Sequence, residues 1–221
     1  MFKHQHPYPP FIPKGTDKLI VGTLPPPRFT TGQLKPGDVD FCYGSRDGQL
    51  WLILGRIFET ELENANTENA VRQRIKLLEE NRIGICDMVE CAFRNKMDAS
   101  DAGILNAKFR PMIPILTEHE NIRTLLFTGG NSRNGPEYFF RKYLKKYPEI
   151  KLEAVQENIV PRIYSFRLGN RMIKTVSLTA PSGAANRAVG AMDLYKKMKA
   201  ENPAFDTIDF RVMQYKEFFL Q

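Results

Sequence analysis

Two short, uninterrupted apolar runs constrain the fold of this chain most strongly. Leu19-Ile20-Val21 lies between Gly15 and Gly22, and Leu125-Leu126-Phe127 is followed by the pair Gly129-Gly130. A strand that is buried on both faces of a parallel sheet has such a continuous apolar run, whereas a strand with one solvated face alternates apolar and polar residues. Both runs therefore predict central strands of a sheet that helices cover on each face.

Helical and strand patterns alternate along the rest of the chain. Leu50, Ile53, Leu54 and Ile57 have the spacing of one helix face, which predicts a helix that begins near Asp47. The turn pair Gly169-Asn170 predicts a hairpin of residues 162–168 and 172–178. Further helices are predicted over residues 68–81, 109–119, 136–143 and 188–199, and further strands over 82–89 and 207–213. This order predicts an α/β fold, a three-layer α/β/α sandwich with a central, mainly parallel sheet.

The length of 221 residues suits one such domain. We expect this domain to span residues 17–221 and to follow a Pro-rich extension, residues 1–16, that behaves as a mobile tail. The extension lacks the apolar segment of a signal peptide, and three cysteines argue against a disulfide framework. We therefore expect a cytoplasmic, monomeric protein that does not enter a membrane and that carries no metal or cofactor.

The charge of the chain favours an anionic partner. It has 32 basic and 25 acidic residues, hence a net charge of +7. Such a balance suits nucleic acid or a phosphorylated ligand, and it suits equally a soluble protein that is simply basic. The predicted strands are followed by loops 22–28, 129–133 and 179–187, each with small residues and an arginine. Ligands of open α/β sheets bind at this edge, outside the carboxyl ends of the strands.

Short motifs in and around these loops occur in a characteristic order. They are Gly22-Thr23-Leu24-Pro25, Phe41-Cys42-Tyr43-Gly44-Ser45, Leu50-Trp51, Gly84-Ile85-Cys86-Asp87-Met88-Val89, Thr128-Gly129-Gly130-Asn131 and Ala180-Pro181-Ser182-Gly183-Ala184-Ala185-Asn186-Arg187. In order and spacing, over about residues 18–197, the chain resembles the uracil-DNA glycosylase superfamily, in particular its mismatch-specific and hypoxanthine-type branches. The resemblance implies a three-layer fold, a base flipped out of single- or double-stranded DNA, and hydrolysis of its N-glycosidic bond.

The resemblance also implies roles for individual residues. Tyr43 would stack on the flipped base, and Asn131 would read its edge, because an amide both donates and accepts. Both residues have ordinary alternatives, a half-buried tyrosine at a helix entry and a turn or cap asparagine. Further base contacts are implied for Gly22, Thr23 and Leu24, and contacts with the DNA for Pro181, Ser182, Gly183, Asn186 and Arg187.

Three positions depart from the usual pattern of the superfamily. Leu24, Gly48 and Ala180 stand where polar residues commonly position water or stabilise the departing base. Asp47 is the best replacement as a catalytic carboxylate, although it could simply stabilise the start of a helix. Asp87 is a weaker candidate, and Asp98 and Asp101 are expected to cap a short helix. The alternatives to a glycosylase are an inactive nucleic-acid-binding protein on this fold, and a hydrolase or binder of a small nucleotide or other phosphorylated ligand.

Overall fold

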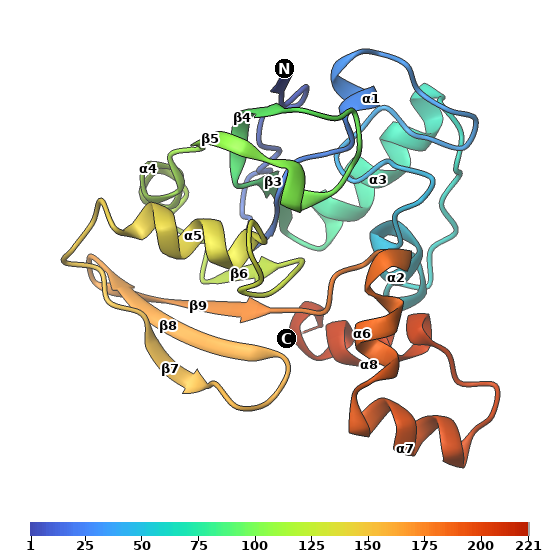
Figure 1. Cartoon of the computed structure of the whole chain (residues 1–221). Coiled ribbons are helices and arrows are strands. Elements are labelled where there is room, and N and C mark those ends of the chain that lie inside the picture. The colour runs from blue at the N-terminus through green and yellow to red at the C-terminus, as the bar shows by residue number, and fades with distance from the viewer. Residues whose placement is uncertain (221) are drawn as a thin grey trace.

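A six-stranded sheet forms the centre of the computed structural model, which describes residues 1–220 (Figure 1). The strand order is β3-β2-β6-β9-β8-β7, and the first four strands are parallel to one another. The hairpin of β8 and β9 has the predicted turn, and β7 extends the sheet as an antiparallel edge. The strands are β2 (Lys18–Gly22), β3 (Ile83–Asp87), β6 (Thr124–Phe127), β7 (Glu153–Gln156), β8 (Arg162–Leu168) and β9 (Arg171–Ser177).

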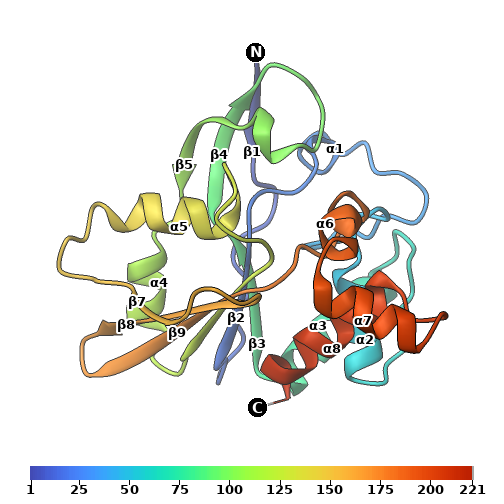
Figure 2. The same cartoon turned by 60° about the horizontal axis from the view of Figure 1, so that its bottom comes forward.

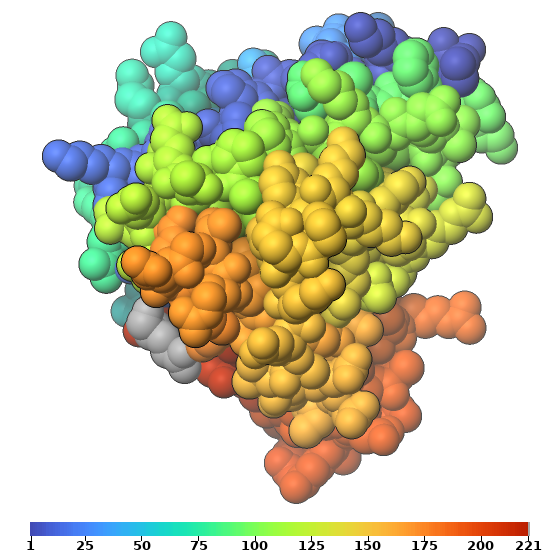
Figure 3. Space-filling model, turned by 90° about the vertical axis from the view of Figure 1, so that its left-hand side faces the viewer, coloured from blue at the N-terminus to red at the C-terminus, as the bar shows by residue number. Residues whose placement is uncertain are grey.

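Helices cover both faces of this sheet, and Figure 2 shows the two helical layers on either side of β2 and β3. Ile20 and Leu126 pack with one layer, whereas their neighbours Leu19 and Leu125 pack with the other. Figure 3 shows the chain from α5 to β9, in yellow and orange, across the middle of one side of the molecule. The first layer has α2 (Leu50–Ile57), α3 (Glu68–Glu80) and α8 (Thr207–Phe219), and the second has α4 (Met112–Glu118) and α5 (Pro136–Leu144). The predicted three-layer α/β/α fold is confirmed.

The N-terminal segment belongs to a second, three-stranded sheet that the sequence patterns did not predict. Strand β1 (Phe2–Gln5) pairs with β4 (Val89–Arg94), which pairs with β5 (Leu105–Phe109), all antiparallel. The side chain of His4 is buried, and its Nδ1 accepts a hydrogen bond of 2.8 Å from Nε of the buried Arg94. Further along, Phe11 exchanges backbone hydrogen bonds with Ile85 of the central sheet. The expected mobile tail is therefore wrong, because its prolines lie in a segment that is held at both ends.

The C-terminal part of the chain contains two further differences. Residues 207–213, predicted as a strand, begin helix α8, because Asp206 and Asp209 form a reciprocal capping box at its start. The helix predicted over 188–199 is two helices, α6 (Asn186–Gly190) and α7 (Asp193–Glu201). A short helix, α1 (Pro27–Thr30), follows β2. Within residues 1–220, none of the helices has both the length and the apolarity to cross a membrane.

The His4–Arg94 contact gives a test of the N-terminal segment. Burial, and next the Arg94 charge, lower the pKa of His4 to about 4, so the imidazole is a neutral acceptor at pH 7. His4→Ala leaves Nε of a buried guanidinium without its partner. We expect the free energy of unfolding, measured in urea, to fall by about 1–3 kcal/mol. Lys3→Ala, on the exposed neighbour in the same strand, is the control, and equal losses for the two variants would contradict this role.

Candidate active site

Three parallel strands bring their carboxyl ends together at one edge of the central sheet. Gly22, which ends β2, is paired in register with Asp87, which ends β3. On the other side of β2, the backbone N–H of Thr128 donates to the carbonyl of Val21. The three residues are buried or nearly so. They form the floor of the edge at which the sequence predicts a ligand.

Asp87 is held at this floor by a histidine from the N-terminal segment. His6 Nε2 lies 2.8 Å from Asp87 Oδ2, and the backbone N–H of Tyr8 donates to His6 Nδ1. Since Nδ1 accepts that hydrogen bond, Nε2 carries the proton and donates it toward the carboxylate. The other carboxylate oxygen, Oδ1, points toward Gly22, where a Cβ would approach it to 2.4 Å. His6 thus orients Asp87 so that one oxygen faces the edge of the sheet.

Tyr43 reaches over the same glycine from the loop before α2. Its hydroxyl is 2.8 Å from Thr128 Oγ1, and a Cβ on Gly22 would lie 1.9 Å from this hydroxyl. Burial, followed by the Asp87 charge, raises the pKa of Tyr43 well above 10, so the phenol is neutral. Its backbone has a φ of 55°, an uncommon value for a residue with a side chain. The ring is half-buried and is fixed across the ends of β2 and β6.

A second carboxylate approaches the edge from the loop between β4 and β5. Thr23 Oγ1 donates to Asp101 Oδ2 over 3.2 Å, and Asn134 Nδ2 donates to the Asp101 carbonyl over 2.8 Å. Burial raises the pKa of Asp101 from 3.8 to about 6, and the nearby Asp87 charge acts in the same direction. The expectation that Asp101 caps a helix is wrong, because its side chain bonds to Thr23 instead. Asp98 does accept a local backbone hydrogen bond, from Ser100 N–H.

Asp47, the predicted catalytic carboxylate, has a different environment. Its side chain is 68% exposed, with Oδ2 3.3 Å from Arg28 Nη2 and Oδ1 3.9 Å from Arg46 Nε. Among the described residues, no hydrogen bond joins Asp47 to Tyr43. The same Arg28 makes two shorter contacts with the buried Asp38. Asp47 thus lies exposed beside Arg28 and Arg46, whereas Asp87 and Asp101 lie at the edge of the sheet.

The other predicted base contacts lie around the floor. Thr23 is at the edge, next to Asp101, whereas Leu24 is buried and packs in the core under α4 and α5. Asn131 is exposed in the loop after β6. The neighbouring Asn134 is the buried asparagine of this loop, through its bonds to the 101–104 backbone.

The predicted DNA-binding loop lies against the turn before α2. Gln49 N–H donates to the Pro181 carbonyl over 2.8 Å, and Gly48 forms a bridge with Ser182. The buried Arg211 of α8 supports the loop from below, through the Asn186 side chain and the Ala180 and Ser182 carbonyls. The Asn186 amide oxygen therefore has an internal partner. Gly183 and Arg187 are exposed on the outside of the loop.

The hollows described next lie away from Tyr43 and Asn131, the two residues predicted to contact the base. A cavity of about 510 Å³ lies between α2 and the loop that follows it, and is lined by Trp51, Arg56 and Leu62 among others. Another, of about 450 Å³, lies along the N-terminal segment beside His6 and Arg110. Neither is lined by Tyr43 or Asn131. In this structure the space above Gly22 is filled by the Tyr43 hydroxyl and the Asp87 carboxylate.

Comparison with known proteins agrees with this architecture. The chain is 27% identical over 129 residues to the hypoxanthine DNA glycosylase of Methanosarcina barkeri, an alignment that covers 57% of this chain and 71% of that protein. Its fold is similar to the solution NMR structure of a Methanosarcina acetivorans protein provisionally assigned as a uracil DNA glycosylase. For that pair the TM-score is 0.54 and the identity 17%, over 95% of this chain and 98% of the other. No family model matches the chain.

These similarities define the class of the protein. Its sheet order and its helical layers are those of an α/β protein with a central, mainly parallel sheet. The sequence similarity to a hypoxanthine DNA glycosylase agrees with the resemblance that the sequence motifs indicate.

The close approach at Gly22 is testable by a single methyl group. Gly22→Ala places a Cβ 1.9 Å from the Tyr43 hydroxyl and 2.4 Å from Asp87 Oδ1, so both side chains must move. We expect the free energy of unfolding to fall by about 1–3 kcal/mol, the usual cost of overpacking. Tyr43→Phe in the Gly22→Ala background should recover part of this loss. Gly183→Ala, where a Cβ meets nothing within 4 Å, is the control, and an equal loss there would contradict the close approach.

Proposed function

We propose that the protein is a DNA glycosylase, which flips a deaminated or damaged base to the carboxyl edge of the sheet and hydrolyses its N-glycosidic bond. The observation that carries this proposal is Asp87, a buried carboxylate that His6 orients and whose second oxygen faces the edge. When this bond breaks, the sugar becomes cation-like and the base anion-like. A fixed carboxylate next to the sugar stabilises the first of these charges, and can orient the attacking water.

The neighbouring side chains suit a flipped base. Tyr43 offers an aromatic ring whose hydroxyl contacts Thr128 Oγ1, and base stacking on such a ring offsets part of the cost of flipping. Asn131 is exposed at the next loop, from which its amide can read a base edge. Gly22 and Thr23 allow a close approach to the backbone of β2. Binding of a base here requires the Tyr43 ring to move, since its hydroxyl now occupies the space above Gly22.

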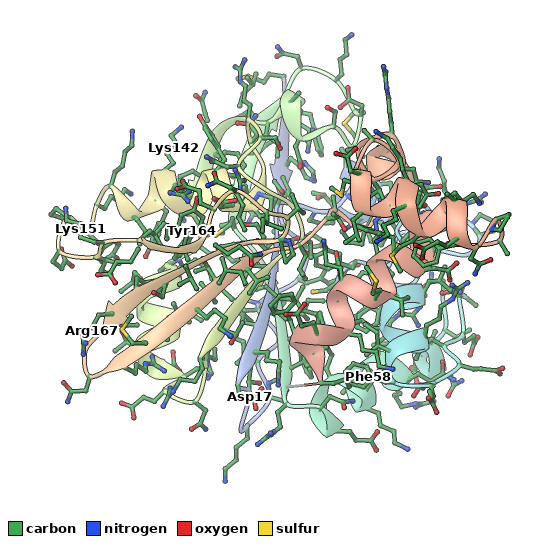
Figure 4. The ribbon with its side chains drawn as sticks, turned by 90° about the horizontal axis from the view of Figure 1, so that it is seen from below. Asp17, Phe58, Lys142, Lys151, Tyr164 and Arg167 are labelled. Atoms are coloured by element: carbon green, nitrogen blue, oxygen red, sulfur yellow. The ribbon has the colours of Figure 1, made fainter. Side chains whose placement is uncertain are left out.

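We expect the strand that carries the base to pass over the loop of residues 181–187. Arg187 is exposed there and, within residues 1–220, makes no ion pair. Pro181, Ser182 and Gly183 present backbone close to the turn before α2. Other exposed cations, such as Lys142, Lys151 and Arg167, extend from a different side of the molecule, formed by α5 and the β8–β9 hairpin, and are not part of this path (Figure 4). We propose that Arg187 contacts a phosphate and that Asn186 acts only by supporting its loop.

One observation favours a second candidate, a nucleic-acid-binding protein without catalytic activity. The floor of the edge is closed by Tyr43, and Leu24 and Ala180 supply no polar side chain. Such a protein would bind DNA through the same loops but excise no base. A panel of oligonucleotides with uracil, hypoxanthine, xanthine or ethenocytosine, single- and double-stranded, separates the two candidates.

We expect substitutions of Asp47 and of Asp87 to have different effects on catalysis. Asp87 lies in a buried, low-dielectric position, where a charge interacts strongly, whereas water and two arginines screen Asp47. We expect Asp87→Asn to reduce single-turnover cleavage of the best panel substrate by ~10²-fold or more. Asp47→Asn should reduce it far less, while both variants keep DNA binding. If Asp47→Asn has the larger effect, Asp47 is the catalytic carboxylate after all.

The DNA path predicts a charge-specific effect on binding. We expect the affinity for duplex DNA to fall steeply with salt, with a slope of about −0.9 in log K against log salt for each phosphate neutralised. Arg187→Ala should weaken binding and reduce the slope by about one such unit, with little change in base preference. Arg167→Ala is the control, because Arg167 pairs with Met172 near the start of β9, at the opposite edge of the sheet. A flat salt titration would argue against any nucleic-acid partner.

A further inference from the structure

Hydrogen bonds hold Asp101, in the loop between β4 and β5, at the edge of the central sheet. Its backbone carbonyl accepts from Asn134 Nδ2, and the carbonyl of the preceding Ser100 accepts from Arg94 Nη1 over 2.6 Å. Arg94 is fully buried and is itself anchored on His4. The side chain of Asp101 is then fixed by Thr23, the residue directly after the end of β2. Strands β1 and β4 of the small sheet, together with the loop after β6, thus position the carboxyl group of Asp101.

The two carboxyl groups approach the edge from different sides. Asp87 follows from β3 and bonds to His6, whereas Asp101 comes from the β4–β5 loop and bonds to Thr23. The two environments differ: Asp87 has a donor fixed on one oxygen, and Asp101 has a weak hydroxyl contact and a nearby like charge. Paired carboxyl groups whose surroundings differ in this way typically divide the roles of acid and base.

We propose that Asp101 is the general acid of the reaction, and that it protonates the departing base, whereas Asp87 accepts the proton of the attacking water. This role rests on the proposed glycosylase function and goes beyond it. Such a donor is needed because Leu24 and Ala180 cannot hydrogen-bond to the base through their side chains. The proposal assigns the protonation of the departing base to the β4–β5 loop, which lies outside the sequence motifs of the superfamily.

The step is balanced as an ordinary hydrolysis. The bond between C1′ and the base nitrogen breaks, and its electron pair leaves with the base. The proton of the Asp101 carboxyl group moves to the base, directly or through a bound water. The oxygen of a water forms a bond with C1′, and its proton passes to the Asp87 carboxylate. Proton exchange with solvent then returns both side chains to their starting forms.

The charges around Asp101 are compatible with an acid that functions near neutral pH. Burial and Asp87 raise its pKa to about 6, whereas the Thr23 hydroxyl and the Arg94 guanidinium lower it. Asp98, in the same loop, lies 3.8 Å from Arg94, but its side chain is half-exposed and water screens its charge. His4, on the other side of Arg94, is neutral at pH 7, since its pKa is about 4. Because the raising effects are larger, Asp101 keeps its proton to a higher pH than an exposed aspartate does.

The decisive experiment compares leaving groups. Single-turnover excision is measured from matched oligonucleotides with uracil or 5-fluorouracil, and also with hypoxanthine, from pH 4.5 to 8. 5-Fluorouracil departs more easily as an anion, so it needs less help from an acid. We expect Asp101→Asn to slow the excision of uracil by ~10²-fold or more, to slow that of 5-fluorouracil much less, and to remove the decline in rate above pH 6. Asp98→Asn, a half-exposed carboxylate of the same loop, is the control.

The results separate this role from the function on which it rests. If the wild type excises bases and Asp101→Asn slows both pyrimidines equally, or not at all, Asp101 is not the acid, although the protein remains a glycosylase. If the wild type excises none of the three bases, the proposed function fails, and the role of Asp101 fails with it.

A second measurement does not depend on activity. The folded pKa of Asp101, about 6, lies above the unfolded value of 3.8, so the folded state holds this proton more tightly. The stability that the proton confers is present in full below pH 4 and is lost as the pH rises through 6. Wild type should therefore lose stability relative to Asp101→Asn between pH 4 and 6, and the difference should level off above pH 7. A difference that is the same at every pH would overturn the placement of Asp101.

Discussion

The parallel pairing of β2 with β3 and β6 is the contact on which the rest of the site depends. Leu19, Ile20 and Val21 have no exposed surface, so a slip of β2 by one residue would exchange the two helical layers beneath these side chains. The register is therefore firmly fixed. Because it is fixed, Gly22 lies beside Asp87, and Thr128 follows at the next strand. The hydrophobic core thus determines which polar groups meet at the edge.

The polar edge has to be stabilised by segments far away in the sequence. A buried carboxylate without partners is costly, and Asp87 receives its hydrogen bond from His6, 81 residues earlier. Asp101 receives its own from Thr23, and its backbone is held by Asn134. The small sheet of β1, β4 and β5 brings His6, which follows β1, and Asp101, which lies between β4 and β5, to this edge. It folds the first residues of the chain onto Arg94, and so joins the N-terminus to the loop that carries Asp101.

Sequence patterns predicted the parts of this structure that arise from local or periodic signals. The apolar runs identified β2 and β6, the 3.6-residue period identified α2, and Gly169-Asn170 identified the hairpin of β8 and β9. Helix α8 was missed although its capping box, Asp206 and Asp209, is visible in the sequence. The small sheet could not be predicted in this way, because β1 owes its strand form to pairing with β4 some 90 residues later. The same holds for the site, where only spatial neighbours distinguish Asp87 from Asp47.

Leu24, Gly48 and Ala180 depart from the usual motifs of the superfamily, and the structure shows which residues surround them. In the sequence they stand as gaps in a familiar set of motifs, and they argue for a weak or inactive protein. In the structure Leu24 fills the core under α4 and α5, and Gly48 forms a bridge with Ser182, where a Cβ would lie 3.1 Å from the Ser45 carbonyl oxygen. Polar groups approach the same edge from β3 and from the β4–β5 loop instead. A site at the end of a sheet is surrounded by several loops, so the chemistry that one loop lacks can come from another. The absence of a motif residue therefore argues against activity only when no other polar side chain reaches the same edge, and here Asp87 and Asp101 reach it.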